Sequence, residues 1–281
     1  MGVQSGFYDL DLALRENEFK SRSYLRIDKG GLIGGKVYVL AGRPGMGKTT
    51  LLLNILENTS VRGTRLAHCP AVLFSLEMSK RQIIDRLISI DSGIDIKKIN
   101  GMYFNSQEWE AFEKEISILK SSKLIIDDRL EFDIDEIYEK SIKYYKENHI
   151  ALIAIDYLQV VDHREMKDIY EKMAYIMKRL KVLAEKLSIP IIITSHISKL
   201  AEYHKNCRPQ LSDFKPEDIV KYADVVMCLY MEDYYKLDSD KKGIAEVMVF
   251  PDNGCSRTVE LGYTKCGYVN LEKDKYTEDK S

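Results

Sequence analysis

The string GRPGMGKT at residues 42–49 limits what this chain can fold into more than any other feature of the sequence. It matches G-x-x-x-x-G-K-[ST], the phosphate-binding loop known as Walker A. The mostly apolar residues 36–41 before it predict a buried strand, and the mostly apolar residues 51–56 after it predict a helix. A strand, a glycine-rich turn and a helix N-terminus direct several backbone N–H groups toward one anion. This context argues against an accidental match.

The residue types in the loop fit a nucleoside triphosphate bound with Mg²⁺. Gly42 and Gly47 permit backbone conformations that a Cβ hinders. The Lys48 ammonium can reach the β- and γ-phosphates, and the Thr49 hydroxyl can bind Mg²⁺. We therefore expect nucleotide contacts from the whole loop and from the threonine after it: Gly42, Arg43, Pro44, Gly45, Met46, Gly47, Lys48, Thr49 and Thr50.

The composition is that of an ordinary globular protein, and it excludes some classes. A length of 281 residues suffices for one large α/β domain. With a net charge of −2 there is no global basic field, so any nucleic-acid contact must come from local loops. The five cysteines form no C-x-x-C pair, which is typical of a reducing compartment. Because the sequence shows no signal peptide and no apolar run long enough for a membrane span, we expect a cytoplasmic protein.

Short apolar runs alternate with amphipathic stretches along the chain. The apolar runs predict strands at 71–75, 124–126, 150–156, 190–195 and 223–230. The amphipathic stretches predict a helix that stops at Gly93, a helix over 106–121 with Ser106 as N-cap, and helices over 134–146 and 169–187. We expect Trp109 and Ile169 to lie on the buried faces of their helices. The alternation indicates an α/β fold with a mostly parallel sheet covered by helices on both faces.

The C-terminal part of the chain follows a different pattern. Segments 245–250 and 257–263 flank Pro251-Asp252-Asn253-Gly254, which predicts a hairpin and therefore antiparallel strands at the sheet edge. Residues 272–281 are expected to form a charged tail. Since we find neither a repeat nor a linker, residues 1–271 are expected to form a single domain.

An NTPase also needs a carboxylate for Mg²⁺ and a base for the attacking water. Asp156 ends an apolar strand, and ligands of open α/β sheets gather at the carboxyl ends of strands, so we assign Asp156 and Thr49 to Mg²⁺. The next residue is Tyr157, so the base is not adjacent. Glu77 ends another strand, which we expect beside the strand of the phosphate loop, and it is the candidate base. The alternative is an ordinary acid in the first turn of the following helix.

The tripeptide Thr194-Ser195-His196 sits at the end of the strand over 190–195. A polar side chain at this place, His196 in particular, can contact the γ-phosphate and report hydrolysis to the next loop. The alternative is a loop histidine without a ligand.

The following segment, 199–215, carries basic residues that suit single-stranded nucleic acid. The candidates are Lys199, Lys205, Arg208 and Lys215, and Arg164 with its neighbours His163 and Lys167 can add to the same surface. The alternative is a solvated surface loop.

Several strings together carry a family resemblance. Besides the loop at 42–49 they are SGFYDLD at 5–11, FSLEMS at 74–79, IDYLQ at 155–159, LKVLA at 180–184, RPQLSD at 208–213, ADVV at 223–226 and DYY at 233–235. In these strings the chain resembles the C-terminal ATPase domain of the DnaB-like replicative helicases, which has a RecA-type core. The strings around Glu77 and Asp156 are the most specific.

The resemblance implies a RecA-like P-loop fold and an ATP-dependent DNA helicase that acts in DNA replication. It implies a hexameric ring on single-stranded DNA, with ATP and Mg²⁺ between subunits and a primase or a loader as partner. Lys48, Thr49, Asp156 and Glu77 would have the roles given above. The ring could be a homo-oligomer or a mixed ring with other helicase subunits.

The chain departs from the family pattern in four places. The sequence begins at the ATPase domain, ahead of which the family has an N-terminal domain and a linker helix, so we expect either a fragment or a naturally short protein. Phe250-Pro251-Asp252 stands where the family has Lys-x-Arg, whose Arg is the finger inserted into the neighbouring subunit's site, and Arg257 lies five residues further on. His196 stands where the family usually has Gln. The string FKPED at 214–218 replaces the family's Leu-Arg-Glu-Ser-Gly, which contacts DNA.

Two functional hypotheses follow. The first is an ATP-driven helicase motor, favoured because one chain carries the loop, the Mg²⁺ carboxylate and the base. The second is an ATP-binding accessory or regulatory subunit, which hydrolyses weakly because the usual finger is absent. A RecA-type recombinase fits less well, since the FSLEMS string points to the helicases.

Overall fold

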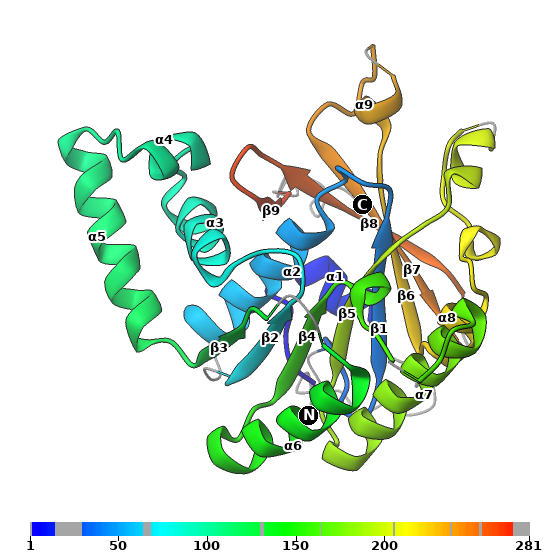
Figure 1. Cartoon of the computed structure of the whole chain (residues 1–281). Helices are drawn as coiled ribbons and strands as arrows, with labels where there is room; N and C mark the ends of the chain where they lie inside the picture. Colours follow the sequence, from blue (N-terminus) through cyan, green and yellow to red (C-terminus); the bar gives the residue numbers. More distant parts are fainter. Residues whose placement is uncertain are drawn as a thin grey trace, which may run out of the picture.

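A single mixed sheet runs through the molecule (Figure 1). The computed structural model describes residues 2–14, 30–63, 69–129, 132–163, 165–204, 206–236, 238–252 and 255–271. Within these residues the strand order is β3-β2-β4-β5-β1-β6-β7-β8-β9. The strands are β1 (Val37–Gly42), β2 (Ala71–Ser75), β3 (Leu124–Asp127), β4 (Leu152–Asp156), β5 (Ile191–His196), β6 (Val225–Met231), β7 (Ile244–Pro251), β8 (Arg257–Tyr263) and β9 (Tyr268–Asn270). β1 to β6 pair in parallel, and β7, β8 and β9 are antiparallel additions at one edge.

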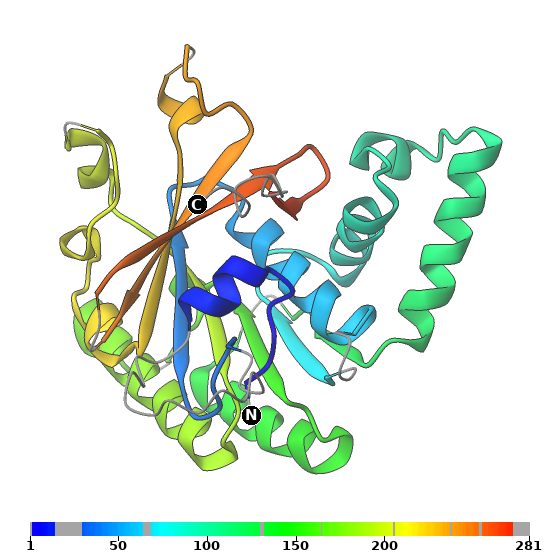
Figure 2. The same cartoon turned by 180° about the vertical axis from the view of Figure 1, so that it is seen from behind.

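Helices cover both faces of the sheet, and α4 and α5 pack with α3 in a separate small cluster beside it. The helices of the described residues are α1 (Tyr8–Ala13), α2 (Lys48–Leu56), α3 (Lys80–Ser92), α4 (Ile96–Gly101), α5 (Ser106–Ser121), α6 (Ile134–Asn148), α7 (Ile169–Leu187), α8 (Asp218–Tyr222) and α9 (Glu232–Tyr235). Short 3₁₀ and π segments are η1 (Glu57–Val61), η2 (Leu158–Val160), η3 (Lys199–Tyr203) and η4 (Leu211–Asp213). α6 and α7 lie on the face toward the viewer in Figure 1, and α1 and α2 lie on the opposite face, seen in Figure 2.

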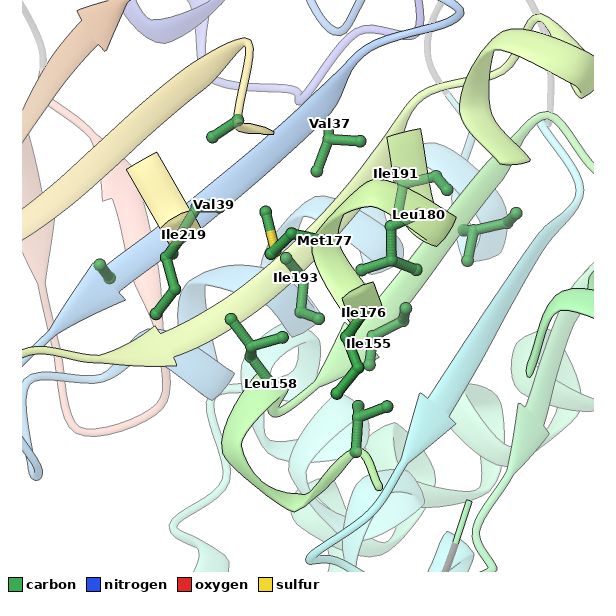
Figure 3. Packing of buried hydrophobic residues seen from close by; sticks show 14 of the residues in the cluster. Val37, Val39, Ile155, Leu158, Ile176, Met177, Leu180, Ile191, Ile193 and Ile219 are labelled. Carbon is green, nitrogen blue, oxygen red and sulfur yellow. The ribbon is translucent and has the colours of Figure 1, made fainter. Parts of the chain in front are cut away.

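The central strand β1 is buried on both faces, which explains its continuous apolar sequence. Its alternate side chains enter two separate cores. Val37 and Val39 pack with α6, α7 and α8, as Figure 3 shows for part of that cluster. Tyr38 and Leu40 pack with α1, α2 and α3. Burial on both sides therefore fixes the position of the strand that carries the phosphate loop.

Local sequence explains where the helices begin and end. Ser79 caps α3 in a capping box with Gln82, and Gly93 ends that helix with a φ of 70°. In α7 every third or fourth residue from Met173 to Leu187 is buried, and this stripe packs on the sheet.

The predicted fold class is confirmed. Strands 71–75 and 257–263 and helices 106–121 and 169–187 have the predicted bounds, and the other predicted strands differ by one or two residues. The hairpin strands pair as expected, although Asn253 and Gly254 of its turn, like the tail over 272–281, lie outside the described residues.

Three smaller predictions are wrong. Asn105, not Ser106, caps α5, because the Asn105 side chain accepts from the Glu108 N–H at 2.8 Å. Trp109 is 43% exposed, since it covers the rings of Phe104 and Phe112 from outside instead of entering the core. Ile169 is exposed because it lies in the first turn of α7, beyond the edge of the sheet cluster.

Among the described residues, no helix has the length and apolar character needed to cross a membrane.

A substitution in α7 tests the core. Leu180 is fully buried between α7 and the sheet, so Leu180→Ala should lower the free energy of unfolding by about 2–5 kcal/mol. Val182→Ala, on the exposed face of the same helix, should change it by less than about 0.5 kcal/mol. Urea unfolding followed by circular dichroism measures both. Equal effects would contradict the orientation of α7.

Candidate functional site

The loop 42–47 joins the end of β1 to the start of α2, and its glycines have two different purposes. Gly45 and Gly47 have positive φ angles of 82° and 75°, which favour glycine. A Cβ on Gly42 would lie 3.3 Å from the Leu229 Cβ, so this glycine permits close packing instead. The backbone freedom expected at Gly42 is thus found at Gly45.

Lys48 folds back over the loop. Its ammonium donates to the carbonyl oxygens of Gly42 at 3.0 Å and Arg43 at 3.1 Å, and the residue is 7% exposed. Burial lowers the pKa of Lys48 to about 8; the carboxylates of Asp156 and Glu77 oppose this shift, and the Arg43 guanidinium adds to it. A partly desolvated ammonium above a glycine-rich loop suits a polyphosphate.

Two tyrosines from the C-terminal strands close over this loop. The Tyr268 hydroxyl donates to the Met46 carbonyl at 2.9 Å. A Cβ on Gly47 would lie 2.7 Å from that hydroxyl and 3.2 Å from the Tyr263 ring. Sequence reasoning missed this contact, because the three residues of β9 are too few for strand periodicity to show.

Asp156 is a buried carboxylate at the end of β4. The Thr49 hydroxyl donates to its Oδ2 at 2.9 Å, and the Thr194 hydroxyl from the neighbouring β5 donates to its Oδ1. The structure therefore brings together the two residues expected to hold Mg²⁺, and hydroxyl and carboxylate oxygens are ligands that suit this ion. Thr194 orients the carboxylate from the other side.

Glu77 reaches the same edge of the sheet by a route that the sequence did not predict. The expectation that its strand lies beside β1 is wrong, because β4 and β5 lie between β1 and β2. However, Ser75 is in register with Asp156, and the Leu76 N–H donates to the Asp156 carbonyl at 2.8 Å. The exposed Glu77 thus follows directly beside Asp156, and its charge acts on Lys48.

His196 ends β5 in the same region. Its ring lies edge-on to Tyr157, with centroids 4.7 Å apart, and its Nδ1 is buried without a hydrogen-bond partner among the described residues. Burial lowers the pKa of His196, and the Lys48 charge acts in the same direction. Gln159 holds the strand end, since it donates to the Ser195 hydroxyl at 2.8 Å and accepts from the His196 N–H at 3.3 Å. Gln159 was part of a recognised string, but its contacts could not be read from the sequence.

The structure describes some of the candidate DNA-binding residues and leaves others outside the described residues. Arg164 and Lys205 lie outside the described residues. Lys199 is exposed in η3, and Lys215 is exposed with an ion pair to Glu217 at 2.9 Å. Lys167, which follows Arg164 by three residues, is exposed.

Two basic candidates have structural contacts instead of an open surface. Arg208 donates to Glu246 at 2.8 Å and lies over the Tyr230 ring, 4.9 Å from its centroid. His163, expected at the surface, is buried edge-on to Tyr175. Charge counting along the sequence could not separate these residues from solvated ones.

The end of β7 is the position expected for the arginine finger, and it carries no arginine. The structure shows the contacts of the residues found there. Pro251 is in register with Val225, and the Asp252 N–H donates to the Asp224 carbonyl at 3.0 Å. Arg257 across the hairpin donates to the Leu12 carbonyl of α1 at 3.2 Å. Its guanidinium thus contacts its own chain.

Comparison with known proteins decides the family. The model of the DnaB-like helicase C-terminal domain matches residues 21–269. The chain belongs to this family. DnaB-like helicases are ATP-dependent DNA helicases, and use of ATP and Mg²⁺ is a property of the family.

Two curated relatives of this DnaB-like chain are about 1.7 times as long as the chain. It is 29% identical over 278 residues to the replicative DNA helicase DnaB of Geobacillus stearothermophilus, covering 97% of this chain and 57% of the relative. It is 32% identical over 256 residues to DnaB of Buchnera aphidicola subsp. Baizongia pistaciae, covering 89% and 54%. The chain thus spans little more than half the length of these relatives.

Solved structures confirm the fold of this DnaB-like domain. One, described as an ATPase domain, superposes with a TM-score of 0.85 at 29% identity and covers 97% of this chain and 92% of that one. Another, a DnaB-like replicative helicase studied with its interactions with primase, gives 0.83 at 28% identity, covering 97% and 62%.

A glycine pair tests the loop. Gly47→Ala should weaken nucleotide binding at least tenfold, because the methyl group would strike Tyr268 in addition to straining a positive φ. Gly93→Ala is the matched control: its φ is 70°, but nothing lies within 4 Å of the added methyl. It should cost about 1 kcal/mol of stability and leave binding unchanged. Fluorescent-nucleotide titration and urea unfolding measure the two effects. Equal binding losses would contradict the steric role of Tyr268.

Proposed function

We propose that this chain is an ATP-hydrolysing motor domain that moves along single-stranded DNA as part of a ring and unwinds duplex DNA in replication. The observation that carries the proposal is the meeting of Lys48, Thr49, Asp156 and Glu77 at one edge of the sheet. The family and its replicative relatives support it. A primase is a candidate partner, because a related helicase was solved with its interactions with primase.

Each residue has a role that its surroundings support. Lys48 leaves the carbonyls of Gly42 and Arg43 to contact the β- and γ-phosphates, while backbone N–H groups of the loop bind the phosphate oxygens. Thr49 and Asp156 would hold Mg²⁺, which neutralises developing negative charge on the phosphates.

Glu77 accepts a proton from the attacking water as general base. Glu77 is exposed, so water has access to it, and it follows two residues after Ser75, which is in register with Asp156. His196, held by its contact with Tyr157 and by Gln159, is placed to contact the γ-phosphate and to transmit its loss to the segment after β5.

One observation favours a second candidate, an ATP-binding accessory subunit with weak intrinsic hydrolysis. Phe250-Pro251-Asp252 offers no arginine to a neighbouring site, and Arg257 contacts Leu12 of its own α1. Loss of such an arginine costs about 10³-fold or more in other phosphoryl-transfer enzymes. In a mixed ring, other subunits would supply it.

ATP turnover with and without single-stranded DNA tests the motor proposal. DNA should stimulate the wild-type protein. Lys48→Ala should abolish both nucleotide binding and turnover. Glu77→Gln should keep binding and lower turnover by about 10²–10⁴-fold, because only the base is lost. Glu113→Gln, an exposed acid on α5, should behave as wild type. Tight binding with negligible turnover that DNA does not change would favour the accessory subunit.

A gain-of-function variant tests the missing finger. If the protein assembles with itself in the family geometry, Asp252→Arg should raise turnover about tenfold or more, because a guanidinium can stabilise transition-state charge. Asp252→Ala controls for simple loss of the negative charge and should change little. Turnover and mass photometry on the same samples relate activity to assembly. An unchanged rate in assembled Asp252→Arg would place the subunit interface elsewhere.

A further inference from the structure

Arg43 contacts two parts of the molecule at once. Its carbonyl accepts from the Lys48 ammonium at 3.1 Å within the phosphate loop. Its guanidinium points the other way: Nε donates to Glu202 at 2.8 Å, and Nη1 donates to the Ile197 carbonyl at 3.1 Å. One residue therefore joins the phosphate loop to residues 197–204, which we call the post-β5 segment.

The post-β5 segment is anchored at buried residues and has long backbone hydrogen bonds between them. Ile197 and Ala201 are buried, and His204 is held by the buried Asp213 at 2.9 Å. Between them, η3 has long backbone hydrogen bonds, 3.3 Å from the Ala201 N–H to the Ser198 carbonyl and 3.4 Å from the His204 N–H to the Ala201 carbonyl. Among the described residues, the hydrogen bond from Arg43 to Glu202, at 2.8 Å, is the shortest one that joins residues 198–203 to the rest of the molecule.

This ion pair differs from an ordinary surface pair. The Arg43 side chain is 12% exposed and Glu202 is 40% exposed, so the guanidinium is poorly solvated and relies on Glu202 and the Ile197 carbonyl as partners. The Lys215–Glu217 pair, with exposures of 48% and 81%, is the ordinary case, in which solvent screens both charges. Replacing Glu202 should therefore have consequences that replacing Glu217 lacks.

We propose that Glu202 is a positioning residue, which holds Arg43 on the post-β5 segment in the nucleotide-free protein and competes with the phosphates of a bound nucleotide for its guanidinium. The inference rests on the proposed function, because it needs a nucleotide at the phosphate loop. A triphosphate brings several negative charges to the loop that contains Arg43, and a guanidinium binds phosphate in the same bidentate manner as carboxylate. Nucleotide binding then releases the η3 region that carries Lys199 and the exposed Tyr203.

Competition predicts that nucleotide affinity rises when Glu202 is replaced, whereas loss of an ordinary stabilising contact would not raise it. Since Glu202 and the phosphates compete, Glu202→Gln should bind nucleotide about fivefold more tightly, which is the scale of modest coupling between sites. In an Arg43→Ala background the same Glu202→Gln change should have no effect, because nothing is left to compete for. Glu217→Gln should leave affinity unchanged in both backgrounds. Titration of a fluorescent ADP analogue measures all six proteins.

Hydrogen exchange provides a readout that needs neither DNA nor hydrolysis. In the wild-type protein, ADP should speed amide exchange in residues 198–204 by about threefold or more, as local opening becomes easier. In Glu202→Gln, exchange there should already be fast and should not respond to ADP.

The outcomes separate this inference from the proposed function. Weaker nucleotide binding by Glu202→Gln, or an equal change in the Arg43→Ala background, would overturn the competition. Normal ADP binding with unchanged exchange in residues 198–204 would overturn it as well, and would leave the motor proposal intact. Failure of the wild-type protein to bind nucleotide would overturn both.

Discussion

The Asp156 carboxylate accepts the hydrogen bonds on which the rest of the site depends. It accepts from Thr49 at the start of α2 and from Thr194 on β5, so one buried group joins three chain segments that are far apart in sequence. Burying a carboxylate is costly unless its oxygens are hydrogen-bonded, and here both are. The position of the phosphate loop relative to β4 is thereby fixed before any nucleotide arrives.

Sequence reasoning predicted the parts of this arrangement that local physics determines. The loop at 42–49, the carboxylate at the end of β4 and the stripe along α7 each follow from residue type and spacing within a short window. The register between Ser75 and Asp156 does not, because it depends on which strands become neighbours. For this reason Glu77 was assigned to the right edge of the sheet through a wrong strand order.

Contacts that join distant segments could not be predicted from the sequence for the same reason. Tyr268 meets Met46 across 222 positions, and Arg43 meets Glu202 across 159. A short window marks Met46 and Arg43 as parts of the phosphate loop, but nothing in it marks Tyr268 or Glu202 as their partners. Charge counting was also insufficient: Arg208 and Lys199 are both basic residues of one loop region, yet only Arg208 is tied to a buried carboxylate. Family strings located the functional region, whereas the structure shows which side chains in it remain available.

The contacts of Lys48 explain why the phosphate loop favours an anionic ligand. Its ammonium is satisfied by two carbonyl oxygens but remains poorly solvated, and burial lowers the pKa to about 8. A polyphosphate would supply the charge that neutral carbonyls lack, so binding would relieve a desolvation penalty already present in the fold. Arg43 differs, because Glu202 already neutralises it. Of two cations in one loop, one is therefore ready for phosphate, whereas the other would first have to leave a carboxylate; under the competition proposed above, this difference would separate nucleotide binding from the response of the segment beyond β5.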